Sequence, residues 1–298
     1  MARKAEKPEI RIGISGWRYA PWRGVFYPKG LKQKDELAYA ARIFNSIEVN
    51  GTFYSLQRPD SFRAWHDQTP DGFVFAVKGP RYISHILRLS NADAALANFF
   101  ASGILLLKQK LGPLLWQLPP NFSFQPDRLE RFFEMLPRST AEAARLARRH
   151  EARMKGRSWT RSDADRPIRH ALEIRHDSFK DPAFIRLLRR HRIGLVVADT
   201  VEWPLLMDTT ADFVYCRLHG SRQLYASGYG RKALADWAAR IRAWTEGKEA
   251  KGDHAGPPGR RALRDVYVYF DNDAKVRAPF DAQSLMRKVG IASSTPAL

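Results

Sequence analysis

Eight short apolar runs of strand type recur along this chain of 298 residues, and helix-period segments separate most of them. Strand–helix alternation of this kind indicates a parallel sheet, and eight units close naturally into a (β/α)8 barrel. A doubly wound open sheet is the alternative, but no glycine fingerprint of the dinucleotide-binding type follows the first run. We therefore predict an α/β protein with a single TIM barrel. The runs cover residues 10–17, 46–54, 73–80, 113–120, 170–179, 193–200, 213–220 and 265–273.

Two segments look like insertions in the repeat, and both precede a strand. The first, about 138–168, begins with a helical pattern and carries much of the excess basic charge: residues 138–169 hold ten basic and four acidic side chains. The second, about 247–261, is rich in Gly, Pro and charged residues and is expected to be a mobile loop. In a barrel, both should lie on the face of the strand N-termini, opposite the usual active site. The expected barrel domain is 10–290, with tails at 1–9 and 291–298.

Composition and charge limit the partners and the cellular compartment that we expect for the chain. The net charge of +19 is compatible with a nucleic acid or another anionic partner. The single cysteine excludes an internal disulfide framework and fits a reducing compartment. No apolar stretch follows the charged N-terminus, and the longest apolar run is too short to span a bilayer. We expect a cytoplasmic protein without a membrane partner; the oligomeric state is open.

Polar side chains gather near the C-terminal end of every predicted strand. Residues two apart share a strand face, so one face of each strand is mostly apolar and its opposite face turns polar at the end. TIM-barrel enzymes build their active sites at this rim. The alternative is a buried network of mutually neutralising charges. Eight strands turning polar at one rim favour a ligand pocket. The polar set is Ser15, Glu48, Asn50, Lys78, Gln117, Glu173, Arg175, Asp199, Arg217, His219, Tyr269 and Asp271.

Three cationic side chains in this set, Lys78, Arg175 and Arg217, favour an anionic group such as phosphate or carboxylate. The loop after the seventh strand, HGSRQLYASGYGRKAL, leads into a helix and could hold phosphate, although an ordinary flexible loop would read the same way. Aromatic residues after the first two strands could stack on a sugar or a base, or pack beneath a loop. We predict a small anionic ligand.

The sequence points to acid–base chemistry rather than covalent catalysis by Ser or Cys. It has no Gly-x-Ser-x-Gly elbow and no P-loop, and Cys216 falls on the helix-facing side of its strand. Carboxylates together with His219 suit general acid–base catalysis. The same residue types could bind a divalent metal, but the neighbouring Lys and Arg would repel it. We therefore expect no cofactor, with a divalent metal as the weaker alternative.

Seven motifs resemble the YecE-like family, a bacterial and archaeal domain-of-unknown-function family with a TIM-barrel fold. They are GISGWRYAPWRGVFYP, IEVNGTFY, FAVKGP, LGPLLWQLPPNF, ALEIRHDSF, CRLHG…LYASGYG and VYVYFDND, in that order from about residue 10 to 290. The resemblance implies the barrel fold but supplies no reaction. Relatives more often carry Asn at the position of Asp271. The motif positions that carry over are Trp17, Glu48, Asn50, Phe53, Tyr54, Lys78, Gln117, Glu173, Arg175, His176, Arg217, His219, Gly220, Tyr225 and Tyr269.

The leading hypothesis is an enzyme that binds its anionic ligand at the C-terminal mouth of the barrel. Glu48, Glu173 and His219 would move protons. The expected ligand-binding residues are Trp17, Asn50, Tyr54, Lys78, Gln117, Arg175, His176, Arg217, Tyr225 and Tyr269. A nucleic-acid-binding or nucleic-acid-processing protein is the second hypothesis, and a non-catalytic scaffold is the third.

Overall fold

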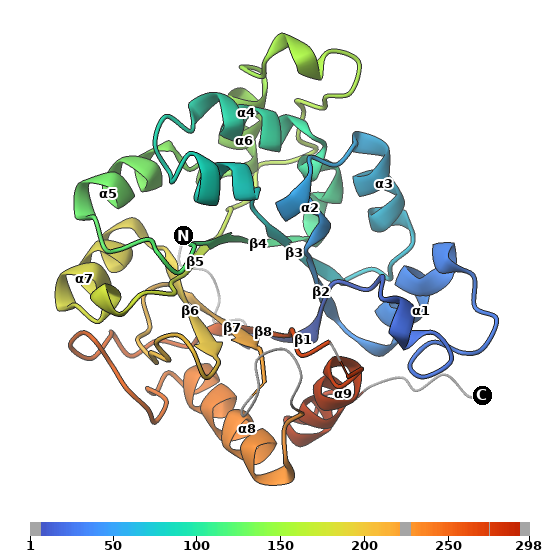
Figure 1. Ribbon diagram of the computed structural model, residues 1–298, viewed down its shortest axis with the longest axis vertical. Helices are drawn as coiled ribbons and strands as arrows, with labels where there is room; N and C mark the ends of the chain where they lie inside the picture. Colours follow the sequence, from blue (N-terminus) through green and yellow to red (C-terminus); the bar gives the residue numbers. More distant parts are fainter. Residues whose placement is uncertain (1–6, 221–227, 274, 293–298) are drawn as a thin grey trace.

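The computed structural model describes residues 7–220, 228–273 and 275–292, and its strands form a closed barrel in sequence order (Figure 1). Each strand pairs in parallel with the next, and β8 closes on β1. The predicted (β/α)8 barrel is therefore confirmed, and the open-sheet alternative is wrong. The strands are β1 Ile10–Ser15, β2 Ser46–Val49, β3 Val74–Lys78, β4 Leu111–Gln117, β5 His170–Glu173, β6 Gly194–Asp199, β7 Phe213–Leu218 and β8 Asp265–Phe270.

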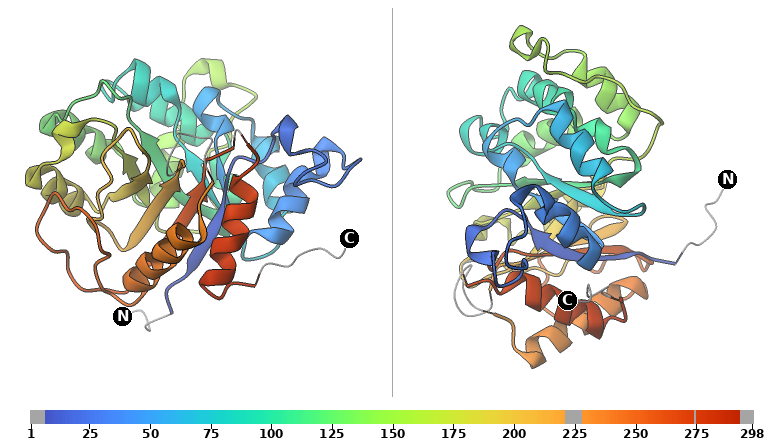
Figure 2. Two further views of the ribbon diagram at one scale, coloured as in Figure 1. Left: turned by 60° about the horizontal axis from the view of Figure 1, so that its bottom comes forward. Right: turned by 90° about the vertical axis from the view of Figure 1, so that its right-hand side faces the viewer.

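Helices surround the barrel on its outer side (Figure 2). The α-helices are α1 Glu36–Ile43, α2 Gly51–Tyr54, α3 Pro59–Asp67, α4 Asp93–Ala101, α5 Pro126–Met135, α6 Thr140–Ala147, α7 Pro182–His191, α8 Arg231–Thr245 and α9 Ala278–Lys288. Shorter turns of 3-10 helix lie at Ala20–Trp22, Gln33–Asp35, Ile104–Lys110, Ala152–Met154 and Asp177–Phe179, and one π-helical turn lies at Tyr82–Ile86.

Helix α7 shows how the sequence sets an element's limits. The Asp181 side chain accepts a hydrogen bond from the backbone N–H of Ala183 at 2.7 Å, and Pro182 occupies the first helical position. Basic residues fill the last turn, where they complement the helix dipole, and Arg192 ends the helix in a left-handed conformation. Phe184, Ile185, Leu187 and Leu188 form the buried face.

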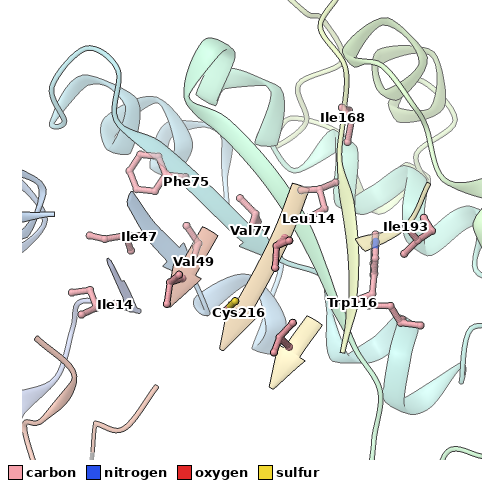
Figure 3. Close-up of a cluster of buried hydrophobic side chains, with 14 of the residues drawn as sticks. Ile14, Ile47, Val49, Phe75, Val77, Leu114, Trp116, Ile168, Ile193 and Cys216 are labelled. Atoms are coloured by element: carbon pink, nitrogen blue, oxygen red, sulfur yellow. The ribbon is translucent and has the colours of Figure 1, made fainter. Parts of the chain in front are cut away.

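The apolar core has two layers, separated by the strands. The outer layer lies between strands and helices, and Figure 3 shows part of it, including Ile14, Ile47, Val77, Trp116 and Cys216. Cys216 is fully buried there, and burial raises the pKa of its thiol. The inner layer fills the barrel beneath its mouth with Ala76, Leu115, Ala171, Val196, Ala198, Phe213, Tyr215, Tyr267 and Tyr269. This layer closes the floor, so any site must lie above it.

The sixth strand differs from the expected orientation. Val196 and Ala198 face the barrel interior, whereas Val197 belongs to the outer layer. Asp199 accordingly points outward and accepts a hydrogen bond from Trp237 Nε1 on α8 at 2.9 Å. The prediction that Asp199 joins the interior polar set is therefore wrong. Both faces of this strand are apolar, so alternation alone did not fix its phase.

No helix forms within 200–212, the connection between β6 and β7, and the second insertion covers that gap. The buried carboxylate of Asp208 accepts hydrogen bonds from the backbone N–H groups of Ala255 and Gly256, at 2.8 and 3.0 Å. Met207 N–H donates to the Asp253 carbonyl at 2.7 Å. The loop leaves α8 and leads into β8 as expected, yet residues 253–255 border a cavity with segments that follow β5 and β6. This part of the insertion thus covers the side of the barrel where no helix connects β6 and β7.

The first insertion packs on the outside of α4, farthest from the barrel (Figures 1 and 2). The predicted helical pattern becomes α6, which ends at Ala147. The Trp159 N–H then donates to the carbonyl of Ala101, at the end of α4, at 2.7 Å. Ser139 and Pro167 form an antiparallel bridge that closes the base of the segment. Its basic side chains are therefore held apart from the barrel mouth.

Candidate active site at the barrel mouth

The C-terminal strand ends bring polar side chains from seven strands to one rim. Ser15 ends β1 and pairs in register with Glu48 of β2, while Gln117 of β4 pairs with Glu173 of β5. Lys78 ends β3, and Arg217 lies one residue before the end of β7. His219 and Asp271 directly follow β7 and β8. The interior direction predicted from alternation is correct for these strands, because their ionic groups contact one another as described next.

Arg217 is the centre of a buried ionic network. Its guanidinium is fully buried and pairs with Glu48 through Nη2–Oε1 at 2.9 Å and Nε–Oε2 at 3.1 Å. Nη1 donates to Glu173 Oε2 at 2.7 Å, and Nη2 donates to Asp271 Oδ2 at 2.8 Å. One guanidinium thus links three carboxylates, from β2, from β5 and from the residue after β8. Its donors are already used, so the predicted ligand-binding role of Arg217 conflicts with this geometry.

Glu48 is held just as firmly. Besides Arg217, it accepts hydrogen bonds from the Ser15 hydroxyl and from Tyr215 Oη, the latter at 2.5 Å. Asn50 Nδ2 supports Ser15 through a 2.7 Å hydrogen bond to its Oγ. Both carboxylate oxygens have partners and the side chain is fully buried. Glu48 therefore positions Arg217, and the geometry does not support the predicted proton-transfer role.

Glu173 pairs with two arginines, Arg175 and Arg217, and this pairing explains why a Glu and an Arg lie two residues apart at the end of β5. Arg175 Nε and Nη2 both donate to Glu173 Oε1, at 2.8 and 2.7 Å, while Arg217 takes Oε2. The Arg175 guanidinium also lies 3.7 Å above the ring of Trp203. The ring of His219 meets the edge of Trp203 at 5.6 Å. Glu173 is thus the shared anion of two arginines rather than a free base.

The network keeps its carboxylates ionised. Burial alone would raise the pKa of Glu173, but the guanidinium groups of Arg217 and Arg175 hold it well below its usual range. Burial opposes ionisation of Asp271 in the same way, and Arg217 followed by His219 lowers its pKa. His219 Nδ1 lies 3.1 Å from Asp271 Oδ2. These acids carry fixed negative charge at neutral pH.

Lys78 is a cation at the same rim that makes no ion pair with this network. Its side chain is 7% exposed, and Nζ lies 4.3 Å from the centre of the Phe53 ring. No residue in the described part of the chain accepts a hydrogen bond from this amine. Burial, followed by the charge of Arg217, lowers its pKa to about 8. The next residue, Gly79, allows close packing on β4, because a Cβ atom there would lie 2.4 Å from the Trp116 ring.

His85 lies beside Lys78 although the sequence analysis did not single it out. It belongs to the π-helical turn after β3, and its ring meets the Phe53 ring edge-on at 5.2 Å. Burial, then the charges of Arg175 and Lys78, lowers its pKa to about 4. The imidazole is therefore neutral at pH 7 and able to accept a proton.

Asp273 is the second residue that the sequence analysis missed. Burial, followed by the negative charge of Asp271, raises its pKa well above the usual range. Tyr19 interacts with this carboxyl group and donates a hydrogen bond to the Ser15 carbonyl at 2.5 Å. Asp271 and Asp273 thus form a pair of acids in which one pKa is lowered and the other is raised.

Several predicted ligand-binding residues lie away from the open mouth. Trp17 is 6% exposed and packs edge-to-face on Trp65 at 5.3 Å, so it serves the core. Tyr269 is buried in the inner layer, where its hydroxyl bonds to Ser46 Oγ at 2.6 Å. His176 directs Nδ1 to Ser178 and begins a short helical turn. The ligand-binding roles of these three residues stay predictions.

Other predicted residues keep a place at the rim. Tyr54 is 74% exposed on α2, next to Phe53. Gln117 is buried at the end of β4, and no described residue is hydrogen-bonded to its side-chain amide. Tyr225 falls outside the described residues.

A cavity of about 590 Å³ adjoins the network on the side of β5 and β6. Trp203 forms part of its wall and also contacts Arg175 and His219, so it separates the cavity from the ionic groups. The cavity lining is Asp177, Lys180, residues 201–206 and residues 253–255.

The acidic groups at the mouth surround a guanidinium rather than an empty space. Within residues 7–220, 228–273 and 275–292, no group of three or more His, Cys, Asp or Glu is arranged to bind a metal ion. Any metal placed among Glu48, Glu173 and Asp271 would have to displace Arg217.

The helices within residues 7–220, 228–273 and 275–292 are too short or too polar to cross a bilayer.

Curated relatives match about two fifths of the chain. YecE of Escherichia coli strain K12 is 32% identical over 129 residues, which cover 43% of this chain and 44% of that protein. YunF of Bacillus subtilis strain 168 is 28% identical over 125 residues, covering 40% of this chain and 43% of that protein. Each match thus spans less than half of the relative's length.

Solved structures match almost the whole barrel. A DUF72 family protein from Thermotoga maritima has a TM-score of 0.70 and 24% identity, and the match covers 94% of this chain and 98% of that one. A DUF72 family protein from Enterococcus faecalis has a TM-score of 0.68 and 16% identity, with 97% and 99% covered. These likenesses support the fold. The family model described as "Protein of unknown function DUF72" matches residues 11–297, and the chain therefore belongs to this family.

Proposed function

We propose that the chain is an enzyme that binds a small anionic ligand at the C-terminal mouth of its barrel. The observation that carries this proposal is the state of Lys78: a nearly buried ammonium with no hydrogen-bond acceptor among the described residues. Burying an unpaired charge is costly, and a protein retains such a group where a ligand supplies the missing partner. The donors of the neighbouring Arg217 are taken by carboxylates, so Arg217 does not compete with Lys78 for the ligand.

An apolar rim around the mouth supports a ligand with a ring or an apolar portion. All but one of the large apolar side chains exposed in the described ranges belong to segments that follow a strand's C-terminal end. The exception, Leu263, precedes β8. Exposed apolar groups concentrated at one end are typical of a binding surface. The rim residues are Val25, Tyr54, Tyr82, Ile86, Val201 and Phe280.

Acid and base functions fall to groups other than Glu48 and Glu173. Burial and the nearby charge of Asp271 raise the pKa of Asp273, which is the direction that suits a general acid. His85 is neutral and suits a general base. Asp271 and Asp273 are close acids with pKa values displaced in opposite directions, an arrangement typical of acid–base active sites.

A thermal-shift screen of phosphorylated and carboxylated metabolites tests ligand binding. We expect at least one anion to raise the Tm of the wild type, because a ligand that binds the folded state stabilises it. Lys78→Ala should weaken that binding by about 10- to 100-fold, as expected for losing a charge-assisted hydrogen bond of about 1.5–3 kcal/mol. Lys232→Ala, on the exposed surface of α8, is the matched control and should bind normally. Equal affinity in both variants would contradict the proposal.

A second candidate function, nucleic-acid binding, is favoured by the aromatic and basic surface of the first insertion. The Trp159 ring lies near two guanidinium groups, Arg161 at 5.4 Å and Arg63 at 5.9 Å. Such a surface suits stacking and phosphate contacts. If it binds a single-stranded oligonucleotide, log K should fall linearly with log salt, and Arg161→Ala should reduce the slope by about one contact. Fluorescence anisotropy measures this; a flat salt response would reject the candidate, and Lys78→Ala serves as the distant control.

A further inference from the structure

We propose that Lys78 is a nucleophile that forms an imine with a carbonyl group of the anionic ligand, so that the substrate class is anionic aldehydes or ketones. This inference rests on the proposed function, because the same ligand must first reach the barrel mouth. It adds a covalent step and a chemical class that anion binding alone does not require.

The placement of the amine is the first argument. Lys78 ends β3 at the rim where the βα loops converge, so its Nζ lies above the packed inner layer rather than within it. The face of Phe53 bounds the amine at 4.3 Å and offers no hydrogen-bond acceptor. A lysine desolvated beside another cationic group is a recognised form of activated amine. Arg217 is that second cation.

The protonation state supports the same step. A pKa of about 8 leaves roughly a tenth of the Lys78 side chain unprotonated at pH 7, far more than for an ordinary lysine. Only the unprotonated amine has a lone pair for attack on a carbonyl carbon. Lys110 is also buried, at 2% exposed, and burial lowers its pKa too, but its amine donates to the carbonyls of His66 and Thr69, each at 2.7 Å.

His85 is placed to transfer the protons of the reaction. Both Lys78 and His85 pack against Phe53, and each lies within electrostatic reach of the other. The Nδ1 atom of His85 pairs with Ser84 Oγ at 2.9 Å, and its Nε2 has no partner within the described ranges. Nε2 is thus available to accept a proton from the attacking nitrogen.

The step balances without any additional reagent. The Lys78 lone pair forms a C–N bond while the carbonyl π electrons move to oxygen, which gives a carbinolamine after proton transfer. His85 takes one proton from the Lys78 ammonium before the attack and returns it to the hydroxyl group of the carbinolamine. The C–O bond then breaks as the nitrogen lone pair forms the C=N bond, and water leaves. Overall, ammonium and carbonyl become protonated imine and water, so one positive charge stays on nitrogen. The carboxylates of Glu173 and Asp271 hold fixed negative charge near it.

Reductive trapping tests the inference directly. The full-length protein is incubated briefly with low concentrations of glyoxylate, pyruvate or glyceraldehyde 3-phosphate and sodium cyanoborohydride, and labelled peptides are quantified by mass spectrometry. We expect at least one probe to label Lys78 at least 10-fold faster than Lys232, which is exposed and paired with Asp236. Lys110 should remain unlabelled. The rate of Lys78 labelling should rise with a midpoint near pH 8.

Two variants separate the possible outcomes. Lys78→Arg keeps the positive charge but cannot form an imine, so it should lose the adduct. His85→Gln should slow labelling about 10-fold or more without shifting the site, which a purely structural role would not do. If anions stabilise the wild type but Lys78 reacts no faster than Lys232, the imine is rejected and the proposed function stands. If anions neither raise the Tm of the protein nor slow the labelling of Lys78, both the imine and the proposed function are rejected.

Discussion

Replacing Arg217 by methionine should lower the free energy of unfolding by about 3–5 kcal/mol, the usual effect of removing one partner from a buried ion pair. The substitution preserves much of the apolar volume but leaves Glu48, Glu173 and Asp271 without the cation that links them. Three buried carboxylates at one rim would then repel one another in a poorly hydrated environment. Urea denaturation at pH 7 measures the loss.

The pH dependence identifies the cause of that loss. In the wild type, Glu173 and Asp271 have lowered pKa values, so their contribution is complete above the pKa of the unfolded chain and declines as pH falls below it. Without Arg217, burial should raise the pKa of Asp271 above its unfolded value, while Arg175 still pairs with Glu173. The variant should therefore gain stability as pH falls from 7 to 5, and its deficit relative to the wild type should narrow.

Arg166→Met is the matched control, because Arg166 makes two hydrogen bonds of 2.8 Å to the carboxylate of Asp163 on a partly exposed surface. Losing this pair should cost about 1 kcal/mol or less. A similar cost for Arg217→Met, or a deficit independent of pH, would show that the central network contributes little to stability.

Periodicity was sufficient to predict the barrel. Alternation correctly placed Glu48, Glu173 and Arg217 inside, because each of their strands carries apolar residues on the opposite face. Alternation failed for Asp199, because β6 is apolar on both faces and its sequence does not show which face points into the barrel. The absence of a helix in 200–212, and the role of 247–261 in covering that gap, depended on tertiary contacts such as those of Asp208.

The residue types of the site were predictable, but the division of their roles was not. Sequence alone could not show that the hydrogen-bond donors of Arg217 are occupied by Glu48 and Glu173. This pairing depends on distances between strands that are far apart in the chain. Asp273 could have been found by continuing the alternation two residues past Asp271. Finding His85 required the π-helical turn that brings it to Phe53.

Substituting Lys78 by methionine should stabilise the protein by about 3 kcal/mol at pH 7 while abolishing reaction at this position. Moving the lysine pKa from 10.5 to about 8 represents a penalty of this order for burying the charge. Active-site groups commonly reduce stability in exchange for reactivity. Methionine removes the charge and still fills the space over Phe53.

The advantage of Lys78→Met should shrink between pH 8 and pH 10.5. In that interval the unfolded wild type keeps the lysine proton that the folded protein has released, so wild-type stability rises with pH. Urea denaturation at pH 7 and pH 10 follows the difference. Lys110→Met is the control for burial alone: its amine has backbone acceptors, so the substitution should destabilise the protein. Destabilisation by both variants to the same extent would mean that Lys78, like Lys110, is a structural residue already satisfied by the fold.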